Sequence, residues 1–383
     1  MKKTIYYWSP CIDKVGTVKS TMNSALAVSK FSKEYNVKVI DVFGEWNDYK
    51  EIFFKNNIEK IDLNFNYYNL IPRKGFVLSR ISYLLIIFLS FLPLLSLLKK
   101  NKPDILIVHL ITSLPLILFN FINFKTKLIL RISGFPKLNY LRKKLWSFSA
   151  KNIYKITCPT QELLKKLKEK NIFKKEKLFY LPDAIIDIND FKNKINDKSF
   201  VPEINLDFKY FLSIGRFSKQ KNFLYLLTEF ENFTENNKEI KLLIIGDGEE
   251  KRKIQKFIKI KKLEKKILLL NRTKNVYHYM KKASAFILPS LYEEVGFVIV
   301  EAALSNLFVI SSDCPNGPSE FLDYGNSGIL FSNNKIGELT KKLNFFIEKK
   351  KELEKKKIYT KKNCLQYTKF RHFVVLKEIL NEN

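Results

Sequence analysis

One stretch of the sequence, residues 286–312, sets the strongest limit on the fold of this chain. The apolar run 286–288 stops at Pro289, which is typical of a short buried strand. Apolar residues over 296–304 are spaced as in a helix that is buried on most sides, and residues 308–310 start another apolar run. A strand, a loop, a helix and a strand in this order predict a βαβ unit of a parallel sheet.

Two carboxylates, Glu293 and Glu301, fall inside this unit with seven residues between them. Glu293 lies in the predicted loop and Glu301 early in the helix, so both can reach the end of the sheet where such folds bind ligands. Carboxylates accept hydrogen bonds from vicinal hydroxyls, and the amides of Gly296, Phe297 and Val298 favour a phosphate. The alternative is a helix whose acids merely suit its dipole. Because Glu301 is embedded in an apolar helix, we favour binding.

The rest of the chain alternates between short apolar runs and helical periodicity. At 383 residues it is long enough for two domains. We predict an α/β fold of two doubly wound Rossmann-like domains that face a central cleft. The expected parts are an N-terminal domain over 1–185, a polar linker over 186–204, a second domain over 205–365, and a C-terminal helix within 366–383 that packs back on the first domain. The predicted strands are 4–8, 37–42, 105–109, 128–132 and 153–158, then 210–214, 242–245, 267–270, 285–288, 309–311 and 328–331.

The chain is strongly basic, with 68 Lys and Arg against 38 Asp and Glu and a formal charge of +30. This charge suits an anionic partner, such as nucleic acid, acidic phospholipid or a phosphorylated substrate, although dispersed lysines also indicate compositional bias. No zinc spacing, RNP-like strand or helix-turn-helix is present, which disfavours nucleic acid. The four cysteines are far apart and the N-terminus runs directly into a predicted strand, so we expect a cytoplasmic protein without disulfides or a secretory signal.

Residues 81–98 form an 18-residue run without charge that resembles a membrane segment. Three interpretations are open: a transmembrane span, a buried helix, or a helix in the membrane interface. We favour an interfacial or partly buried helix near 76–100, because a span would separate the first strands from a domain that continues past it. We therefore expect peripheral attachment to the anionic inner face of the cytoplasmic membrane. The basic residues that flank the run are Arg73, Lys74, Arg80, Lys99, Lys100 and Lys102.

A basic turn follows the predicted strand 210–214. Gly215 and Arg216 end the strand, and Lys221 opens the next helix. An arginine fork with a lysine point charge suits a pyrophosphate, and a glycine lets backbone approach a ligand closely. The alternative is a solvated basic turn. Gly246 belongs to a second glycine turn at a strand end, which is a weak signal alone and a stronger one beside the first turn and the acid pair.

These motifs resemble the nucleotide-sugar domain of the retaining family 4 glycosyltransferases, which have the GT-B fold. Four stretches occur in the family's order: SIGRFSKQKN, LLIIGDGEE, YMKKASAFILPS and EEVGFVIVEA. The resemblance covers about residues 208–335. The first half is similar in organisation, and its KVGT sequence at 14–17 resembles the glycine-containing first loop of lipopolysaccharide and capsule transferases.

The resemblance implies a role for each matched residue. Arg216 and Lys221 correspond to the family's pair on the donor pyrophosphate, and Glu301 to the acid that binds the ribose. Glu293 corresponds to the acid near the transferred sugar, with Glu294 as its rival if the loop register differs. The expected catalytic residues are Glu293, Arg216 and Lys221. The expected donor-binding residues are Gly215, Arg216, Lys221, Gly246, Asn275 (for the base), Glu293, Gly296, Phe297, Val298 and Glu301.

One departure from the family concerns the first half. Many members have a histidine after the strand that corresponds to 128–132, near the transferred sugar, whereas this chain has Arg131, Ile132, Ser133 and Gly134 there. His109 ends the preceding strand and could take that role, or it could be structural. The expected acceptor-side residues are Gly16, His109, Ser133 and Gly134. The family needs no metal and no other cofactor, and we expect none here.

The sequence therefore predicts a retaining, metal-independent glycosyltransferase. Its donor would be a nucleotide sugar, and its acceptor a hydroxyl of a lipid-linked, lipopolysaccharide, O-antigen or capsule glycan. Two alternatives remain: a non-enzymatic basic protein that binds membrane surfaces, and another GT-B enzyme such as a sugar-nucleotide epimerase.

Overall fold

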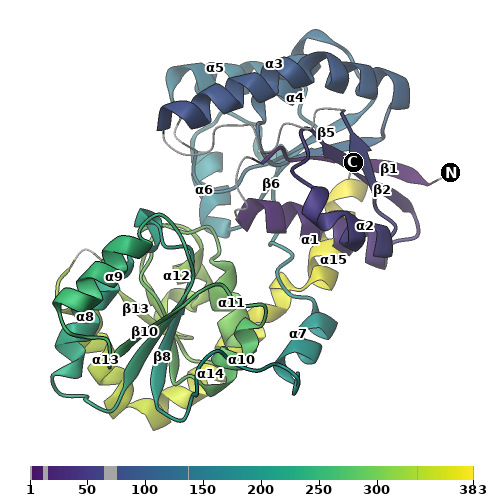
Figure 1. Cartoon of the computed structure of the whole chain (residues 1–383). Helices are drawn as coiled ribbons and strands as arrows, with labels where there is room; N and C mark the ends of the chain where they lie inside the picture. The colour runs from purple at the N-terminus through teal and green to yellow at the C-terminus, as the bar shows by residue number, and fades with distance from the viewer. Residues whose placement is uncertain (1, 12–15, 64–75, 137, 334, 383) are drawn as a thin grey trace. The chain divides into compact units, whose positions relative to one another are not determined.

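The computed structural model describes residues 2–11, 16–63, 76–136, 138–333 and 335–382. The chain forms two compact units (Figure 1). Unit 1 comprises Met1–Ala184 and Lys369–Asn383, and unit 2 comprises Ile185–Thr368. The chain thus passes from one unit to the other twice, after Ala184 and after Thr368.

Unit 1 contains a seven-stranded parallel sheet in the order β3-β2-β1-β4-β5-β6-β7. The direction of strand addition reverses between β1 and β4, which makes the sheet doubly wound. Most of these strands are continuous apolar runs because helices cover both faces. The strands are β1 Lys3–Trp8, β2 Tyr35–Asp41, β3 Glu59–Asp62, β4 Ile105–Val108, β5 Lys127–Arg131, β6 Lys155–Cys158 and β7 Leu178–Tyr180.

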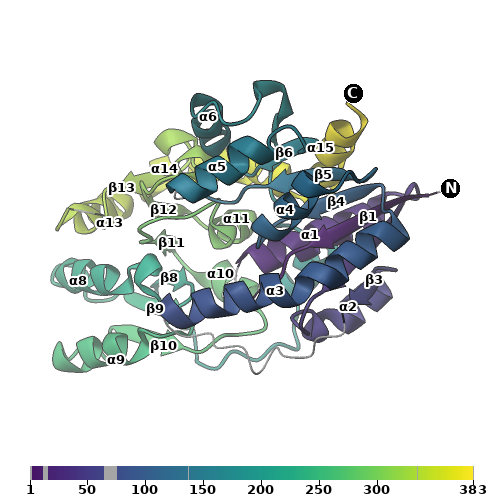
Figure 2. The same ribbon diagram turned by 90° about the horizontal axis from the view of Figure 1, so that it is seen from above.

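The helices of unit 1 form a layer on each face of this sheet (Figures 1 and 2). The core on one face contains side chains of α1 Gly16–Phe31, α2 Lys50–Lys55 and α15 Lys369–Asn381. The core on the other face contains side chains of α3 Phe76–Asn101, α4 Ser113–Phe121, α5 Tyr140–Ser149 and α6 Gln161–Glu169. The short 3₁₀ helices of unit 1 are η1 Asn47–Tyr49 and η2 Lys175–Lys177.

Unit 2 contains a six-stranded parallel sheet in the order β10-β9-β8-β11-β12-β13. Its direction of strand addition reverses between β8 and β11. The expectation of two doubly wound Rossmann-like sheets is confirmed. The strands are β8 Tyr210–Ile214, β9 Lys241–Ile245, β10 Ile267–Leu270, β11 Ala285–Leu288, β12 Val309–Ser312 and β13 Ile329–Phe331.

Helices also cover both faces of the second sheet (Figure 1). One core contains side chains of α8 Phe223–Thr234, α9 Lys251–Ile260 and α13 Glu338–Glu348. The other contains side chains of α10 Val276–Lys282, α11 Phe297–Leu304 and α12 Gly317–Phe321, and α14 Lys350–Asn363 contacts α11. The remaining elements are α7 Ile188–Ile195, η3 Lys219–Lys221, η4 Asp323–Gly325 and η5 Cys364–Tyr367.

The segment 186–204, which the sequence suggests as a linker, differs from that description in the structure. It contains α7 and belongs to unit 2. The ring of Phe191 on α7 meets the ring of Tyr277 edge-on, at 5.1 Å between centroids. Phe191 and Ile195, four residues apart, both pack on the core of unit 2. These two apolar residues are few among polar neighbours, which explains why composition alone indicates a linker.

The apolar segment that the sequence places near 76–100 forms α3. Its part Arg80–Asn101 has a mean hydropathy of 2.5 and is long enough to cross a membrane by length and composition. However, β1 precedes this helix and β4 follows it, and the two strands are hydrogen-bonded neighbours from Ile5 to Trp8. A helix that crossed a bilayer would place these strands on opposite sides, so the fold of unit 1 disfavours the span. Arg73 and Lys74 lie outside the described residues.

Candidate functional site

The loops that follow β8 and β11 lie next to each other at the carboxyl edge of the sheet in unit 2. These two strands pair directly, and the strand order reverses between them. Ligands of doubly wound sheets bind at such a reversal point, outside the carboxyl ends of the strands. Gly215, Arg216 and Lys221 follow β8, and Glu293 and Gly296 follow β11. The topology therefore brings the predicted basic turn and the first predicted acid to one place.

An ion pair between Lys221 and Glu293 joins the two loops. Lys221 Nζ contacts Glu293 Oε1 although 72 residues separate them in the sequence. The hydroxyl of Ser290 donates a second hydrogen bond to the same oxygen at 2.6 Å. The two charged side chains are only 17% and 9% exposed. The carboxylate of Glu293 is thus held in one position with its charge compensated.

The backbone of the Glu293 loop is held from two sides. Leu291 N–H donates to Gln220 O at 2.8 Å, and Gln220 Nε2 donates to Tyr292 O at 2.8 Å. Asn316 Nδ2 donates to Glu293 O at 3.2 Å. These hydrogen bonds come from the η3 turn and from the residue before α12, so two neighbouring segments fix the loop.

Gly317 explains how α12 approaches this loop so closely. A Cβ at Gly317 would lie 1.8 Å from Glu294 O and 2.4 Å from the Cα of Val295. The position therefore needs glycine. The supporting residues Ser290, Gln220, Asn316 and Gly317 had no assigned role in the sequence prediction. All four lie within residues 208–335, the region that the resemblance covers, which is the signal that could have indicated them.

The two predicted donor glycines have clear packing roles. A Cβ at Gly246 would lie 2.0 Å from Gly215 O, so the β8 and β9 loops pack backbone to backbone there. At Gly215 the aliphatic stem of Lys221 lies 3.3 Å from the ideal Cβ position. Gly215 thus makes room for the Lys221 stem. Arg216 follows Gly215 in the chain, and its side chain is exposed. That Gly215, Arg216, Lys221 and Gly246 contact the donor stays a prediction.

The first turn of α11 faces the same strand end. Gly296 is the N-cap residue and has φ +78°, a left-handed conformation that favours glycine. Phe297 and Val298 follow it, and amides of a first helical turn have no acceptor within the helix. Glu301 lies one turn further on and is half-buried. Burial, and after it the nearby charge of Glu301, raise the pKa of the Tyr277 hydroxyl well above its ordinary value. Tyr277 is therefore a neighbour of Glu301 that the sequence did not indicate.

Asn275 has a structural role that its sequence position did not reveal. Its side-chain oxygen caps α10 by accepting from His278 N–H at 3.4 Å. Its side-chain amide donates to Lys194 O on α7 at 2.7 Å. Asn275 is buried, and both ends of its amide have partners within unit 2. Its assignment to a base pocket remains a prediction.

In unit 1 the four predicted acceptor-side residues all follow strands at the carboxyl edge of the sheet. Gly16 is the first residue of α1, after β1. His109 follows β4 and is buried, while Ser133 and Gly134 follow β5 and are half-buried. Because β1 and β4 flank the reversal point of this sheet, the position suits a ligand site. Lys14 and Val15 of the KVGT sequence lie outside the described residues.

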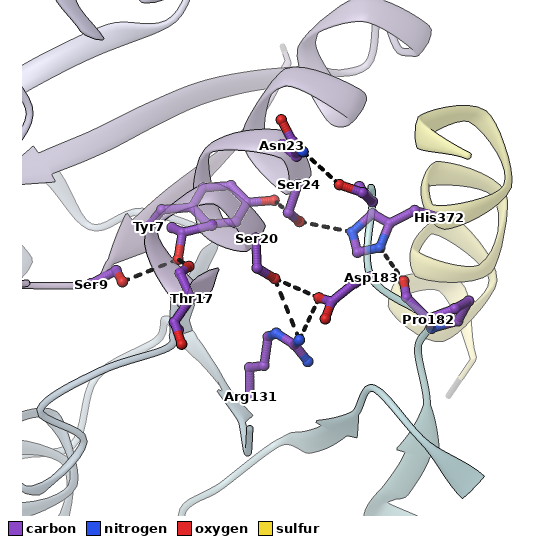
Figure 3. Close-up of polar contacts among 12 residues, drawn as sticks. Tyr7, Ser9, Thr17, Ser20, Asn23, Ser24, Arg131, Pro182, Asp183 and His372 are labelled. Carbon is purple, nitrogen blue, oxygen red and sulfur yellow. Dashed lines mark hydrogen bonds and ion pairs between the residues drawn. The ribbon is translucent and has the colours of Figure 1, made fainter. Parts of the chain in front are cut away.

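A buried polar network lies beside these residues (Figure 3). Arg131, at the end of β5, forms an ion pair with Asp183 at its Oδ1 atom. Ser20 on α1 donates to the same carboxylate, and Arg131 Nη2 donates to Ser20 Oγ at 3.3 Å. Arg131 and Asp183 are both almost completely buried. Next to the pair, Asn23 Nδ2 donates to Ala184 O at 2.7 Å. Asp183 and Ala184, the last residues of unit 1 before the chain enters unit 2, are thus held by the side chains of Arg131, Ser20 and Asn23.

His372 on α15 holds the same segment from the other side (Figure 3). Its Nδ1 lies 2.6 Å from Pro182 O and its Nε2 lies 2.8 Å from Ser24 Oγ. A carbonyl only accepts, so Nδ1 carries the proton and Nε2 of the neutral ring accepts from Ser24. Ser24 Oγ must then accept from Tyr7 OH, which is 3.0 Å away. A neutral His372 satisfies this network, with Tyr7 donating to Ser24 and Ser24 donating to Nε2.

The burial of His372 predicts a loss of stability in mild acid. Burial lowers the pKa of His372 from 6.5 to about 4, and the Pro182 hydrogen bond and the Asp183 charge oppose this less strongly. Below about pH 6.5 His372 becomes protonated in the unfolded chain, whereas in the folded protein it stays neutral down to about pH 4. The free energy of unfolding therefore falls as the pH decreases through this window. The loss attributable to His372 approaches about 3 kcal/mol at its lower end. Denaturant unfolding between pH 7 and pH 5 should show the decline.

A His372→Gln variant is the control, because glutamine does not titrate. Its pH dependence should be weaker than that of the wild type. It should not vanish, because burial also lowers the pKa of His109 well below its ordinary value. An unchanged slope in His372→Gln would contradict the assignment.

Several buried polar atoms at this edge have no hydrogen-bond partner within the described parts of the chain. Buried polar groups in proteins are nearly always satisfied by protein, water or ligand. The unpartnered atoms belong to β5, to β6 and to the segments that follow β4, β5 and β7. They are His109 Nδ1, Arg131 Nε and Nη1, Ser133 Oγ, Thr157 Oγ1 and Asp183 Oδ2.

The described residues show no metal cluster, and their cysteines are buried. All four cysteines are buried thiols. Burial raises the pKa of Cys158, Cys314 and Cys364 to about 12, so these thiols stay protonated near neutral pH. Over the described ranges no group of three His, Cys, Asp or Glu residues could hold a metal ion.

Residues 194–363 match the family model described as glycosyl transferases group 1. This part of the chain is similar to that family. The match spans most of unit 2, including the ion pair between Lys221 and Glu293. The resemblance that the four motifs indicated is thereby confirmed.

Known proteins extend the likeness to the rest of the chain. An uncharacterized glycosyltransferase of Methanocaldococcus jannaschii is 33% identical over 256 residues, which cover 60% of this chain and 60% of that protein. This chain thus aligns with about three fifths of that relative. A Campylobacter jejuni protein named GalNAc-alpha-(1->4)-GalNAc-alpha-(1->3)-diNAcBac-PP-undecaprenol alpha-1,4-N-acetyl-D-galactosaminyltransferase is 26% identical over 86% of this chain and 88% of its own.

A solved structure confirms the fold of the whole chain. The Anabaena protein HepE, in complex with UDP and glucose, matches with a TM-score of 0.73 over 99% of both chains. The identity is 14%, so this likeness concerns the fold alone. The expected GT-B fold is confirmed.

Proposed function

We propose that this protein is a retaining glycosyltransferase that moves a sugar from a nucleotide-sugar donor to a hydroxyl of a glycan acceptor. The observation that carries the proposal is the contact between Lys221 and Glu293 at the reversal point of the unit 2 sheet. A cation suited to phosphate and a carboxylate suited to sugar hydroxyls meet there, in the part of the chain that is similar to the glycosyl transferases group 1 family.

The donor would bind in unit 2 by charge and by backbone amides. Arg216 and Lys221 would hold the pyrophosphate, and the first turn of α11 would contribute amide donors. An ammonium has three donors, so Lys221 can contact a phosphate oxygen while it keeps Glu293. As the bond to the sugar breaks, negative charge grows on the departing diphosphate, and these groups stabilise it. The acceptor hydroxyl would attack from the leaving-group face, which retains the anomeric configuration. No metal is required in this scheme.

The acceptor would meet the carboxyl edge of unit 1. The unpartnered polar atoms beside His109, Ser133 and Thr157 support a hydroxyl-rich ligand there. A lipid-linked glycan is the acceptor class that we favour, and the relative from Campylobacter jejuni carries an undecaprenol-linked substrate in its name. The apolar helix α3 supports a peripheral position on the cytoplasmic face of the membrane, where such acceptors are anchored.

The Glu301→Gln variant tests the donor site. Glutamine keeps the shape but removes the charged acceptor, so affinity for the nucleoside diphosphate should fall by about 1.5–3 kcal/mol. Isothermal titration with UDP and the other common nucleoside diphosphates measures the loss. Glu348→Gln, an exposed acid at the end of α13, is the control and should bind as the wild type does. If Glu301→Gln binds the nucleoside diphosphate as tightly as the wild type does, the assignment of Glu301 to the donor site is wrong.

A panel of nucleotide sugars decides between the proposal and its alternatives. Slow hydrolysis of one nucleotide sugar, with the anomeric configuration retained in the NMR spectrum, supports a retaining transferase. An epimerised nucleotide sugar would indicate a different GT-B enzyme. Vesicle binding without any thermal shift by nucleoside diphosphates would favour a non-enzymatic membrane protein and overturn the proposal.

A further inference from the structure

One region of the sequence is almost free of acidic residues. Between Asp62 and Glu162 the one acid is Asp104, whereas fifteen residues are Lys or Arg. The described parts of this region form α3, β4, α4, β5, α5 and β6 of unit 1. The helices α3, α4 and α5 therefore carry no acidic residue, and their basic residues are Arg80, Lys99, Lys100, Arg142, Lys143 and Lys144.

Helix α3 is buried along a single narrow stripe. Its buried side chains recur at every fourth position, from Ser82 through Ile86 to Leu98. The outward positions, which are normally polar in a soluble protein, are apolar instead, and Phe88 is 80% exposed. The exposed apolar residues of α3 are Leu78, Ile81, Leu84, Leu85, Phe88, Phe91 and Leu92. This face extends over about four helical turns.

Helix α5 presents a second apolar face in the same layer. Trp146 attaches the helix to the core, whereas Leu141 is 75% exposed and Tyr140 and Phe148 are exposed as well. Lys144 Nζ lies 4.7 Å from the centre of the Tyr140 ring, and Lys151 Nζ lies 5.3 Å from that of Phe148. Exposed aromatic rings beside lysines are typical of helices in a membrane interface.

The two faces belong to one surface of unit 1. Helix α4 packs against both α3 and α5, and the three helices lie side by side in both views (Figures 1 and 2). Tyr83 on α3 hydrogen-bonds Ser113 on α4, and Asn120 on α4 hydrogen-bonds Ser149 on α5. Phe121, at the end of α4, adds a further exposed ring. Large exposed apolar areas of this kind mark surfaces that contact a partner.

We propose that α3 and α5 together form a docking surface for an anionic phospholipid bilayer. The apolar side chains would enter the headgroup region, and the lysines and arginines beside them would contact the lipid phosphates. The charge favours a bilayer over a second copy of the chain as the partner. In a dimer through this surface, helices that carry basic and no acidic residues would face each other and repel. This proposal adds α5 to α3 as a second membrane-binding helix. The membrane binding stands by itself, and only its purpose, access to a lipid-linked acceptor, rests on the proposed function.

The location of α5 links this surface to the candidate acceptor edge. The helix follows β5 directly, and the connecting loop contains Ser133, Gly134 and the exposed ring of Phe135. Docking through α5 would bring this loop to the headgroups. A lipid-linked glycan could then reach Ser133 without leaving the membrane.

Vesicle flotation with the full chain tests the proposal. The probes are phosphatidylcholine vesicles with and without phosphatidylglycerol, at low and at high salt. We expect binding to the anionic vesicles only, and its loss at about 1 M salt, where screening is nearly complete. Lys143→Glu with Lys144→Glu, and separately Leu141→Ser with Phe148→Ser, should each weaken binding at least about tenfold. Phe88→Asp on α3 should do the same.

Ile358→Asp on α14 is the matched control, since Ile358 is an exposed apolar residue that belongs to unit 2. It should bind vesicles as the wild type does. Wild-type binding by both α5 variants would overturn the proposal. So would a dimer in solution that Phe88→Asp dissociates, with no vesicle binding. Circular dichroism and thermal unfolding check the fold of each variant. A failure of nucleotide binding alone would affect the proposed function and leave the docking surface standing.

Discussion

An Asp183→Asn variant should unfold at a much lower denaturant concentration than the wild-type protein. The substitution leaves the Arg131 guanidinium charged and buried, without its carboxylate partner. Removing one partner of a buried ion pair costs about 3–5 kcal/mol, a large part of the about 5–15 kcal/mol that stabilise a typical domain. Guanidinium titration followed by circular dichroism measures the shift, and the transition that reports unit 1 should move.

The matched control is Asp190→Asn. Asp190 pairs with Lys194 one helical turn away, and both side chains are about half exposed. Such surface pairs contribute about 0.5 kcal/mol or less, so this variant should unfold as the wild type does. A double variant, Arg131→Met with Asp183→Leu, should be more stable than Asp183→Asn, because no uncompensated charge stays buried. An Asp183→Asn midpoint equal to that of the control would contradict this account.

Strand positions were largely predictable because buried parallel strands are continuous apolar runs. The predicted strands 210–214, 267–270 and 285–288 agree with β8, β10 and β11 to the residue. The sequence prediction missed β3 and β7, which are the two edge strands of the unit 1 sheet. β3 (EKID) is mostly polar, and its residues are half-buried or exposed, so it carries little apolar signal. β7 (LFY) is apolar but only three residues long, too short for a clear strand pattern.

The sequence predicted which loops carry the candidate donor residues. It did not predict which of these side chains contact each other. Strand ends placed Lys221 and Glu293 in two loops of one domain. Their direct contact depends on β8 lying beside β11, and this order is a property of the whole sheet. The hydrogen bond from Ser290 to Glu293, in contrast, is local, because the two residues are three positions apart.

The polar network of unit 1 was out of reach of sequence patterns. Arg131, Asp183 and His372 come from three distant segments, and no local motif connects them. Each also departs from its expected environment, because charged and titratable side chains are rarely buried. The stretch from 63 to 161, in contrast, shows its charge bias directly in the sequence, because Asp104 is its one acid.

The Lys221→Ala variant should slow sugar transfer by about a hundredfold or more. It removes a cation from the departing diphosphate and leaves the Glu293 carboxylate without its partner. Arg216→Ala should reduce the rate by a similar factor if it stabilises the same charge. Lys219→Ala is the control, because Lys219 lies two residues from Lys221 in the same loop with an exposed side chain. Near-wild-type transfer rates for both Lys221→Ala and Arg216→Ala would contradict their role on the diphosphate and favour the alternative of a solvated basic turn.

A double-variant cycle separates the two roles of Lys221. Glu293→Gln alone should mainly lower turnover, because its expected partner is the reacting sugar, and nucleotide binding should change little. If Lys221 acts chiefly by fixing Glu293, the double variant Lys221→Ala with Glu293→Gln should be no slower than the worse single variant. If Lys221 chiefly stabilises the diphosphate, the two losses should multiply. We expect an intermediate result with the losses multiplying in part, because one ammonium can contact phosphate and carboxylate together.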